Sequence, residues 1–253
     1  MRQLLKITTT FALALVFTAG TAFGQILNQQ GNNNTADGDG IQGAYLEQVQ
    51  LGDRNVATVR TTSNNNQSNS YIQRQWNGNE NVARVQQTNV AVQTVQKQKG
   101  TSNFAALLGN ASSSWGNGTL NQVQKGNNNR AAISDGQHDN KAFDFDQKQV
   151  GNRNLSRVRN LSTAQGDVAN MSTTQNGNRN TIRFDWGDYR EGDLSALQRG
   201  NDNTLKSGFS HADQMLTSKQ IGNNNFANVD MRPTAHTGQI TQIGNNNTAT
   251  VTR

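Results

Sequence analysis

The chain is built from a repeat in which glutamine, glycine and asparagine keep a fixed spacing. Ten glycines are each followed three residues later by asparagine, and nine of them are preceded two residues earlier by glutamine. The clearest copies read KQIGNNNFANV at residues 219–229 and TQIGNNNTATV at residues 241–251. Successive glycines lie 21 to 26 residues apart. A period of this length predicts a stack of similar structural units.

Each unit is predicted to fold as two short strands joined by a tight turn. After the asparagine the side chains alternate, so that Ala57 and Val59 share a face with Asn55 whereas Thr58 points away. A similar alternation precedes the glycine, and a period of two residues is typical of strands. Gly and Asn supply the positive φ angles that a tight reversal needs. We therefore predict an all-β chain, a β-solenoid of about ten strand-turn-strand repeats of 22 to 26 residues.

Stacking would place each repeat residue over its copy in the next unit. Neighbouring strands lie about 4.8 Å apart, and side-chain amides at that spacing can hydrogen-bond along the axis, as in cross-β, amyloid-like stacks. Such a ladder of amides and small apolar groups would explain how a chain with 32% hydrophobic residues folds. The predicted ladder positions of four well-preserved units are Gln50, Gly52, Asn55, Ala57, Val59, Gln124, Gly126, Asn129, Ala131, Gln220, Gly222, Asn225, Ala227, Gln242, Gly244, Asn247, Ala249 and Val251.

Some units depart from the pattern. Before Gly78 the glutamine stands one place further away, at Gln75, which predicts a bulge or a wider turn. Bulky inward residues such as Phe145 and Phe184 are expected to widen their rungs. Three units carry another residue in place of the usual alanine, namely Ser156, Ile182 and Leu205. The polar segments predicted to form loops are residues 61–70, 109–119, 134–140 and 231–238.

The Gln-x-Gly-x-x-Asn-x-Ala-x-Val repeat resembles the curlin repeat, which is found in the subunits of curli, the functional amyloid fibres of Gram-negative bacterial surfaces. The resemblance covers roughly residues 29–251. It implies a secreted structural subunit that self-assembles end to end for cell adhesion and biofilm matrix. The partners that it implies are copies of the chain, a related curlin subunit or nucleator, outer-membrane curli-type secretion machinery, and host or abiotic surfaces. The chain departs from the well-known subunits by having more repeats.

Residues 1–24 are predicted to be a secretory signal peptide. Arg2 and Lys6 give a positive start, residues 11–17 are apolar, and small residues up to Gly24 suit a signal peptidase. The alternative is a membrane anchor, but the apolar run is too short to span a bilayer. Residues 25–253 would then form the curlin-like repeat solenoid, exported through the periplasm to the cell surface as part of an extracellular fibre.

Neither catalysis nor a cofactor is predicted. Asp144 and Asp146 flank Phe145, so on a strand both carboxylates would point outward, onto a face without the cleft that shifts a pKa. His138 is the single histidine of its loop, and the Asp-Gly-Asp-Gly stretch at residues 37–40 does not repeat as metal-ligand motifs do, so no metal site is predicted. The chain has no cysteine, which excludes a disulfide framework.

The formal net charge of +6 is modest. Outward basic residues such as Arg84 and Lys206 are expected to limit lateral stacking of sheets. A basic stripe that binds nucleic acid usually carries interleaved aromatic residues. Most of this stripe lacks them, so no specific nucleic-acid partner is predicted.

Two functions from different classes remain open. The first is the fibre subunit, which would grow end to end because an uncovered last rung, ending near Val251, presents unpaired backbone groups. The alternative is a monomeric β-solenoid that binds ice or polysaccharide through a flat face. Such a binder needs one regular outward row. The row directly after the repeat asparagine contains Thr35, Phe104 and Arg130 and is too mixed.

Overall fold

The computed structural model describes residues 25–39, 45–61, 70–87, 90–109, 115–135, 142–159, 168–187, 192–210, 214–231 and 236–252. These residues form twenty β-strands and no helix. The predicted signal peptide lies outside the described residues.

The strands form two ten-stranded sheets, and every pair of neighbours within a sheet is parallel. The first sheet contains β1 (Gln25–Gln30), β3 (Tyr45–Leu51), β5 (Ser70–Trp76), β7 (Val90–Lys99), β9 (Trp115–Lys125), β11 (Ala142–Val150), β13 (Val168–Asn176), β15 (Gly192–Arg199), β17 (Gln214–Ile221) and β19 (His236–Ile243). The second contains β2 (Thr35–Asp39), β4 (Val56–Thr61), β6 (Val82–Gln87), β8 (Phe104–Gly109), β10 (Arg130–Asp135), β12 (Leu155–Arg159), β14 (Thr181–Gly187), β16 (Thr204–Ser210), β18 (Phe226–Met231) and β20 (Thr248–Thr252).

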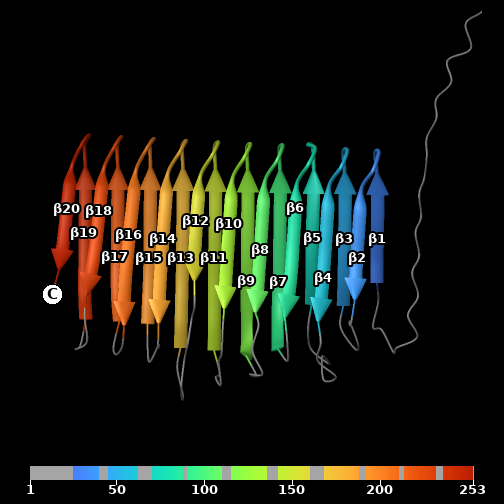
Figure 1. The fold of residues 1–253 in the computed structure, drawn as a ribbon, viewed down its shortest axis with the longest axis horizontal. Coiled ribbons are helices and arrows are strands. Elements are labelled where there is room, and N and C mark those ends of the chain that lie inside the picture. The colour runs from blue at the N-terminus through green and yellow to red at the C-terminus, as the bar shows by residue number, and fades with distance from the viewer. Residues whose placement is uncertain are drawn as a thin grey trace, which may run out of the picture.

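Each unit contributes one strand to each sheet, and we call such a strand pair a rung. The strands run across the long axis of the molecule, and the rungs follow one another along that axis in chain order (Figure 1). The register keeps equivalent residues adjacent, as Gln220 and Gln242 show between β17 and β19. The predicted all-β solenoid is therefore confirmed.

The core between the sheets changes character along each strand. Next to the Gly-Asn turn the buried inward residues are amides and small residues, such as Gln50 and Ala57. Further from the turn they are larger and apolar, such as Leu46, Tyr71 and Val59. Burying apolar side chains contributes about 25 cal/mol per Å². This apolar row therefore supplies the hydrophobic driving force, and the amide rows must satisfy their own hydrogen bonds.

The predicted loops are too long. β8 extends to Gly109, β10 extends to Asp135, β9 begins at Trp115 and β19 begins at His236. The physical reason is strand pairing, because a polar sequence joins a sheet when the neighbouring rung satisfies its backbone groups. Trp115, for example, pairs with Val90 of β7. Residues 62–69, 110–114, 136–141 and 232–235, with His138, lie outside the described residues.

The wider turn predicted before Gly78 is confirmed. Gln75 stays in register with Gln50 and Gln98, and the additional residue, Asn77, has a positive φ of 54°. The turn thus absorbs the extra residue and the ladder keeps its alignment.

In the units with bulkier core residues, a large side chain on one strand of the rung is matched by a small side chain on the other strand. Gln147 lies opposite Ser156, to which its side-chain amide donates a hydrogen bond at 2.8 Å. In the next two rungs Thr173 and Ala196 take the place of that glutamine, and Ile182 and Leu205 take the place of the serine. All four side chains are buried. Phe184 is also fully buried, whereas the side chain of Phe145 lies outside the described part of the chain.

Candidate functional site

A row of glutamine side chains, which we call the first Gln ladder, runs through the core along the whole stack. Each Nε2 donates a hydrogen bond to Oε1 of the next glutamine, at 2.6 to 3.0 Å. The members are Gln29, Gln50, Gln75, Gln98, Gln124, Gln149, Gln175, Gln198, Gln220 and Gln242. The structure therefore joins all four predicted ladder glutamines in one chain of hydrogen bonds.

The same amides tie the two sheets together. From Gln50 onward, each Nε2 also donates to a backbone carbonyl of the second sheet in the preceding rung, at 2.8 to 3.0 Å. Gln220, for example, donates to the carbonyl of Thr204. A buried amide costs free energy unless it is hydrogen-bonded. The ladder meets this condition in the interior rungs, so its amides can replace part of an apolar core.

The repeat asparagines form a second continuous ladder at the turns. Oδ1 of each asparagine accepts a bond from the backbone N–H of the next repeat asparagine, at 2.9 to 3.1 Å. From Asn34 to Asn225, Nδ2 donates to the carbonyl of the glycine in the following rung, at 2.6 to 3.2 Å. These bonds tie Asn55, Asn129, Asn225 and Asn247 into their turns.

The turn requires glycine for two reasons. Gly126 has a φ of 114°, and a Cβ there would overlap the carbonyl oxygen of Gly151 in the next rung. The second positive φ lies on the residue before the repeat asparagine, such as Arg54 at 55° or Asn246 at 58°. The positive φ angles predicted for Gly and Asn are thus found on turn glycines such as Gly126 and, in several units, on the asparagine before the repeat asparagine. The repeat asparagine itself uses its side chain for the ladder and leads directly into the strand.

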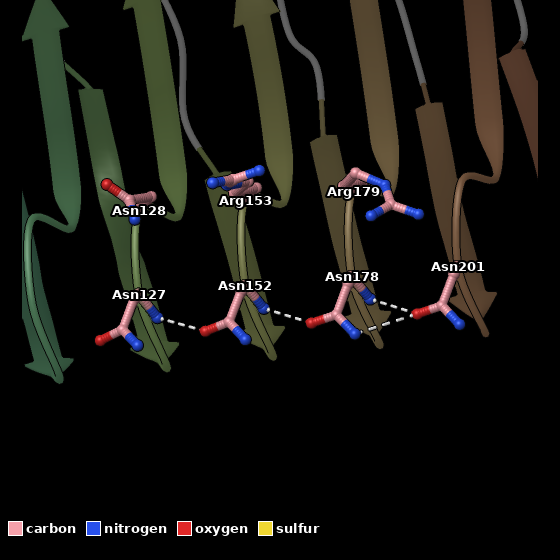
Figure 2. A pocket seen from close by; sticks show the side chains of 7 residues that line it. All are labelled: Asn127, Asn128, Asn152, Arg153, Asn178, Arg179 and Asn201. Atoms are coloured by element: carbon pink, nitrogen blue, oxygen red, sulfur yellow. Dashed lines mark hydrogen bonds between the residues drawn. The ribbon is translucent and has the colours of Figure 1, made fainter.

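A third row of bonds runs on the outside of the turns in the opposite direction. The backbone N–H of Asn127 donates to Oδ1 of Asn152 in the following rung, at 2.9 Å, and the row continues through Asn178 to Asn201 (Figure 2). Beside this row lies an open hollow of about 460 Å³, lined only by asparagine and arginine residues that include Arg153 and Arg179. The hollow offers hydrogen-bond donors and acceptors and positive charge.

A second Gln ladder was missed by reasoning from the sequence. Its hydrogen bonds measure 2.8 to 3.0 Å and link Gln48, Gln73, Gln96, Gln122 and Gln147. These residues stand two positions before members of the first ladder, so a search for Gln-x-Gln before the glycine would have found them. The second ladder stops inside the stack, since Leu27 precedes Gln48 and Thr173 follows Gln147 in register.

The predicted apolar ladder positions face the core. Ala57, Val59, Ala131 and Ala227 are at most 1% exposed. Val251 of β20 is 38% exposed, and Ala249 is half-buried. The difference arises because β20 pairs on one side only within the described residues. The same side chains would be fully covered if another rung lay against β20.

Among the ion pairs that join rungs on the surface, two are held by a pair of hydrogen bonds each. Arg74 holds Glu47 through two hydrogen bonds of 2.6 and 3.0 Å, and Arg179 holds Asp202 through two of 2.6 Å. The hydrogen bonds from Arg74 lower the pKa of Glu47, and those from Arg179 lower the pKa of Asp202. Phe104 and Phe226 also carry cations over their rings, from Arg130 and Lys206 at 5.0 and 5.5 Å.

The two ends of the stack leave complementary groups without partners among the described residues. At β19 and β20 these include one N–H of Gln242 Nε2, Oδ1 of Asn247 and the backbone N–H of Asn245. At β1 and β2 the matching groups are Oε1 of Gln29, the backbone N–H of Asn34 and Oδ1 of Asn32. Each donor at one end thus corresponds to an acceptor at the other.

No protein-family model, curated protein or solved structure matches this chain. Within the described ranges, no three acidic, histidine or cysteine side chains are grouped so as to hold a metal ion. A helix long and apolar enough to cross a bilayer is not found among those residues either.

Proposed function

We propose that this protein is a secreted structural subunit of curli-like functional amyloid fibres, in which copies stack end to end. The observation that carries the proposal is the complementarity of the two ends. Every ladder that reaches both ends has its donors unpaired at one end and its acceptors unpaired at the other. A second copy placed one rung beyond β19 and β20 continues all of these ladders.

The register of such a joint follows from the repeat. Continuing the stack brings Gln242 Nε2 to Oε1 of Gln29 in the next copy. It also brings Oδ1 of Asn247 to the backbone N–H of Asn34 and the N–H of Asn245 to Oδ1 of Asn32. The contact joins unlike ends, so it does not close on itself in a dimer. Heterologous contacts that do not close produce filaments, and unpaired strand edges drive such pairing.

The remaining parts of the proposal rest on the resemblance of the repeat to curlin repeats. They are export through the periplasm and an outer-membrane curli-type machinery, a related subunit or nucleator as partner, and a role in adhesion to host or abiotic surfaces and in biofilm matrix. The predicted signal peptide over residues 1–24 supports export.

The alternative, a monomeric binder of ice or polysaccharide, is less well supported. A flat binding face needs the same side chain at one position of successive rungs. The outward row of the second sheet instead places Phe104 beside Arg130 and Arg130 beside Leu155. Aromatic, basic and aliphatic groups in adjacent rungs provide no regular lattice of one chemistry.

Fibre diffraction on the chain from Gln25 to Arg253, which holds every described strand, tests the proposal. After removal of denaturant at neutral pH we expect fibres that bind an amyloid dye and give a strong meridional reflection near 4.8 Å, about the spacing of neighbouring strands. A chain that stays monomeric at every concentration, with a stable β-sheet signal by circular dichroism, would refute self-assembly as its intrinsic function.

A further inference from the structure

The two ends of the stack each carry a bulky aliphatic residue at a position where the rungs between them carry Gln, Thr, Ala or Ser. At the position of the second Gln ladder, the first rung carries Leu27 and the last carries Ile240. Leu27 is half-buried, and Ile240 is 6% exposed. The first Gln ladder reaches both ends, whereas at this neighbouring position both ends present an aliphatic side chain.

A buried polar atom without a partner lies directly behind each of these aliphatic residues. Oε1 of Gln48, adjacent to Leu27 in register, accepts no hydrogen bond among the described residues. Oγ of Ser218, adjacent to Ile240, likewise has no partner there. Buried polar groups without partners are costly and call for an explanation. A glutamine at position 27 or 240 could satisfy the neighbouring atom, so hydrogen bonding within the single subunit does not account for the aliphatic residues, although Ile240 also packs in the apolar core of its own subunit.

We propose that Leu27 and Ile240 form an apolar contact between successive copies and make the joint selective for the ends of this chain. The proposal rests on the end-to-end assembly proposed above. Continuing the register by one rung places Leu27 of one copy against Ile240 of the preceding copy, beside the hydrogen bond between Gln242 and Gln29. The partner of this surface is a second copy of the chain.

Selectivity follows from the groups that a joint would desolvate. An end with glutamine in place of Leu27 would present Oε1 to Ile240, and an end with glutamine in place of Ile240 would present an N–H to Leu27. Either group is solvated in the free subunit and loses water without gaining a partner in the joint. A solenoid whose second Gln ladder reached its end would therefore join these ends poorly. If both ends carried glutamine, Nε2 of residue 240 in one copy would donate a hydrogen bond to Oε1 of residue 27 in the next, and the two ends would associate well.

The test is a double-mutant cycle on the chain from Gln25 to Arg253. The wild type, Leu27→Gln, Ile240→Gln and the double variant are assembled in a fixed urea concentration that leaves a measurable soluble pool. The concentration left in solution is measured after sedimentation of the fibres. We expect each single variant to raise this soluble concentration about five- to hundredfold. The double variant should bring the soluble concentration back to near the wild-type value. Ile26→Gln and Ile243→Gln serve as controls, because these neighbours are 48% and 67% exposed and should leave it unchanged.

A second measurement separates this contact from a general loss of stability. In dilute solution, where the subunit is monomeric, Leu27→Gln should unfold at the same or a higher urea concentration than the wild type, since it satisfies a buried atom. Ile240→Gln also removes an aliphatic side chain from the core of its own subunit, so a lower urea midpoint in this variant reports lost core packing. The assembly comparison is therefore made at a urea concentration at which every variant is folded. Two results would show that the contact is wrongly assigned while self-assembly stands. In the first, the wild type forms fibres and the single variants leave the same soluble concentration as the wild type. In the second, the double variant raises the soluble concentration by the combined effect of both single substitutions. If the wild type forms no fibres, both proposals fail.

Discussion

Gln220 donates a hydrogen bond of 2.8 Å from Nε2 to Oε1 of Gln242, and Gln242 donates to the carbonyl of Phe226 but to no further glutamine among the described residues. The side chain of Gln242 therefore accepts a hydrogen bond from the preceding rung through Oε1, while one N–H of its Nε2 has no partner among the described residues. A chain of directional amide bonds gives the stack a polarity that aliphatic packing alone would not impose.

Replacing a ladder glutamine should have different consequences in the interior and at the end. Gln124→Leu would leave one N–H of Gln98 Nε2 and the Oε1 of Gln149 without partners inside the core, and we expect a loss of about 2 kcal/mol or more in the free energy of unfolding. Gln242→Leu should cost the subunit less but slow fibre elongation strongly. Urea unfolding of dilute protein and seeded growth followed by dye fluorescence measure the two effects. Gln239→Leu, on the exposed face of β19, is the control and should change neither.

Glycine substitutions should separate turn positions from strand positions. Gly126→Ala places a Cβ against the Gly151 carbonyl at a φ of 114°, and we expect it to destabilise the subunit by about 1–3 kcal/mol or more. Gly208→Ala in β16 meets no atom within 4 Å and should be neutral or stabilising by up to about 1 kcal/mol. The urea midpoints of Gly126→Ala and Gly208→Ala are compared with that of the wild type. Equal destabilisation by the two substitutions would contradict the role of glycine in the turn.

Much of this fold could be read from the sequence because one spacing recurs in every unit. The glycine and the asparagine three residues later set the turn, and the alternation on both sides sets which side chains face the core. The direction of the hydrogen bonds could not be predicted, since an amide can donate either way along the axis. Only the positions of the neighbouring backbone carbonyls, such as that of Thr204 beside Gln220, select one direction.

The extent of the strands was predicted less well. Polar composition suggested a loop over residues 109–119, although Trp115 and its neighbours continue β9. In a stack, the neighbouring strand supplies the hydrogen bonds whatever the side chain, so composition is a poor guide to where a strand begins. The apolar ends at Leu27 and Ile240 were missed for another reason, because their meaning depends on the second Gln ladder beside them.

The stability of the subunit should fall in acid partly through one ion pair. Arg74 lowers the pKa of Glu47, so the carboxylate contributes stability above its unfolded pKa and loses that contribution as pH falls through its lower folded pKa. Glu47→Gln should therefore reduce the difference in urea midpoint between pH 7 and about pH 3. Asp146→Asn, an exposed carboxylate on the same sheet, is the matched control and should leave that difference almost unchanged. An identical pH profile in Glu47→Gln and the wild type would contradict the role of the pair.

The polarity of the joint can be tested by cross-linking, because the chain contains no cysteine. Asn28 and Thr241 are exposed and occupy equivalent register positions in β1 and β19, so the proposed joint places them on adjacent parallel strands. Adjacent strands lie about 4.8 Å apart, within the reach of a disulfide. Fibres grown from a mixture of Asn28→Cys and Thr241→Cys chains should therefore yield covalent dimers of unlike chains on mild oxidation.

Chains carrying Ser172→Cys provide the comparison for this experiment. Ser172 is exposed in the middle of the same sheet, between Asp146 and Ser195 of its own chain, so it cannot approach β1 of another copy in an end-to-end fibre. Mixed with Asn28→Cys chains, it should give no such dimers. Equal cross-linking of both mixtures would indicate lateral association of the sheets. Dimers of Thr241→Cys with itself would indicate that like ends meet, and the donors and acceptors of the ladders would then be opposed instead of matched.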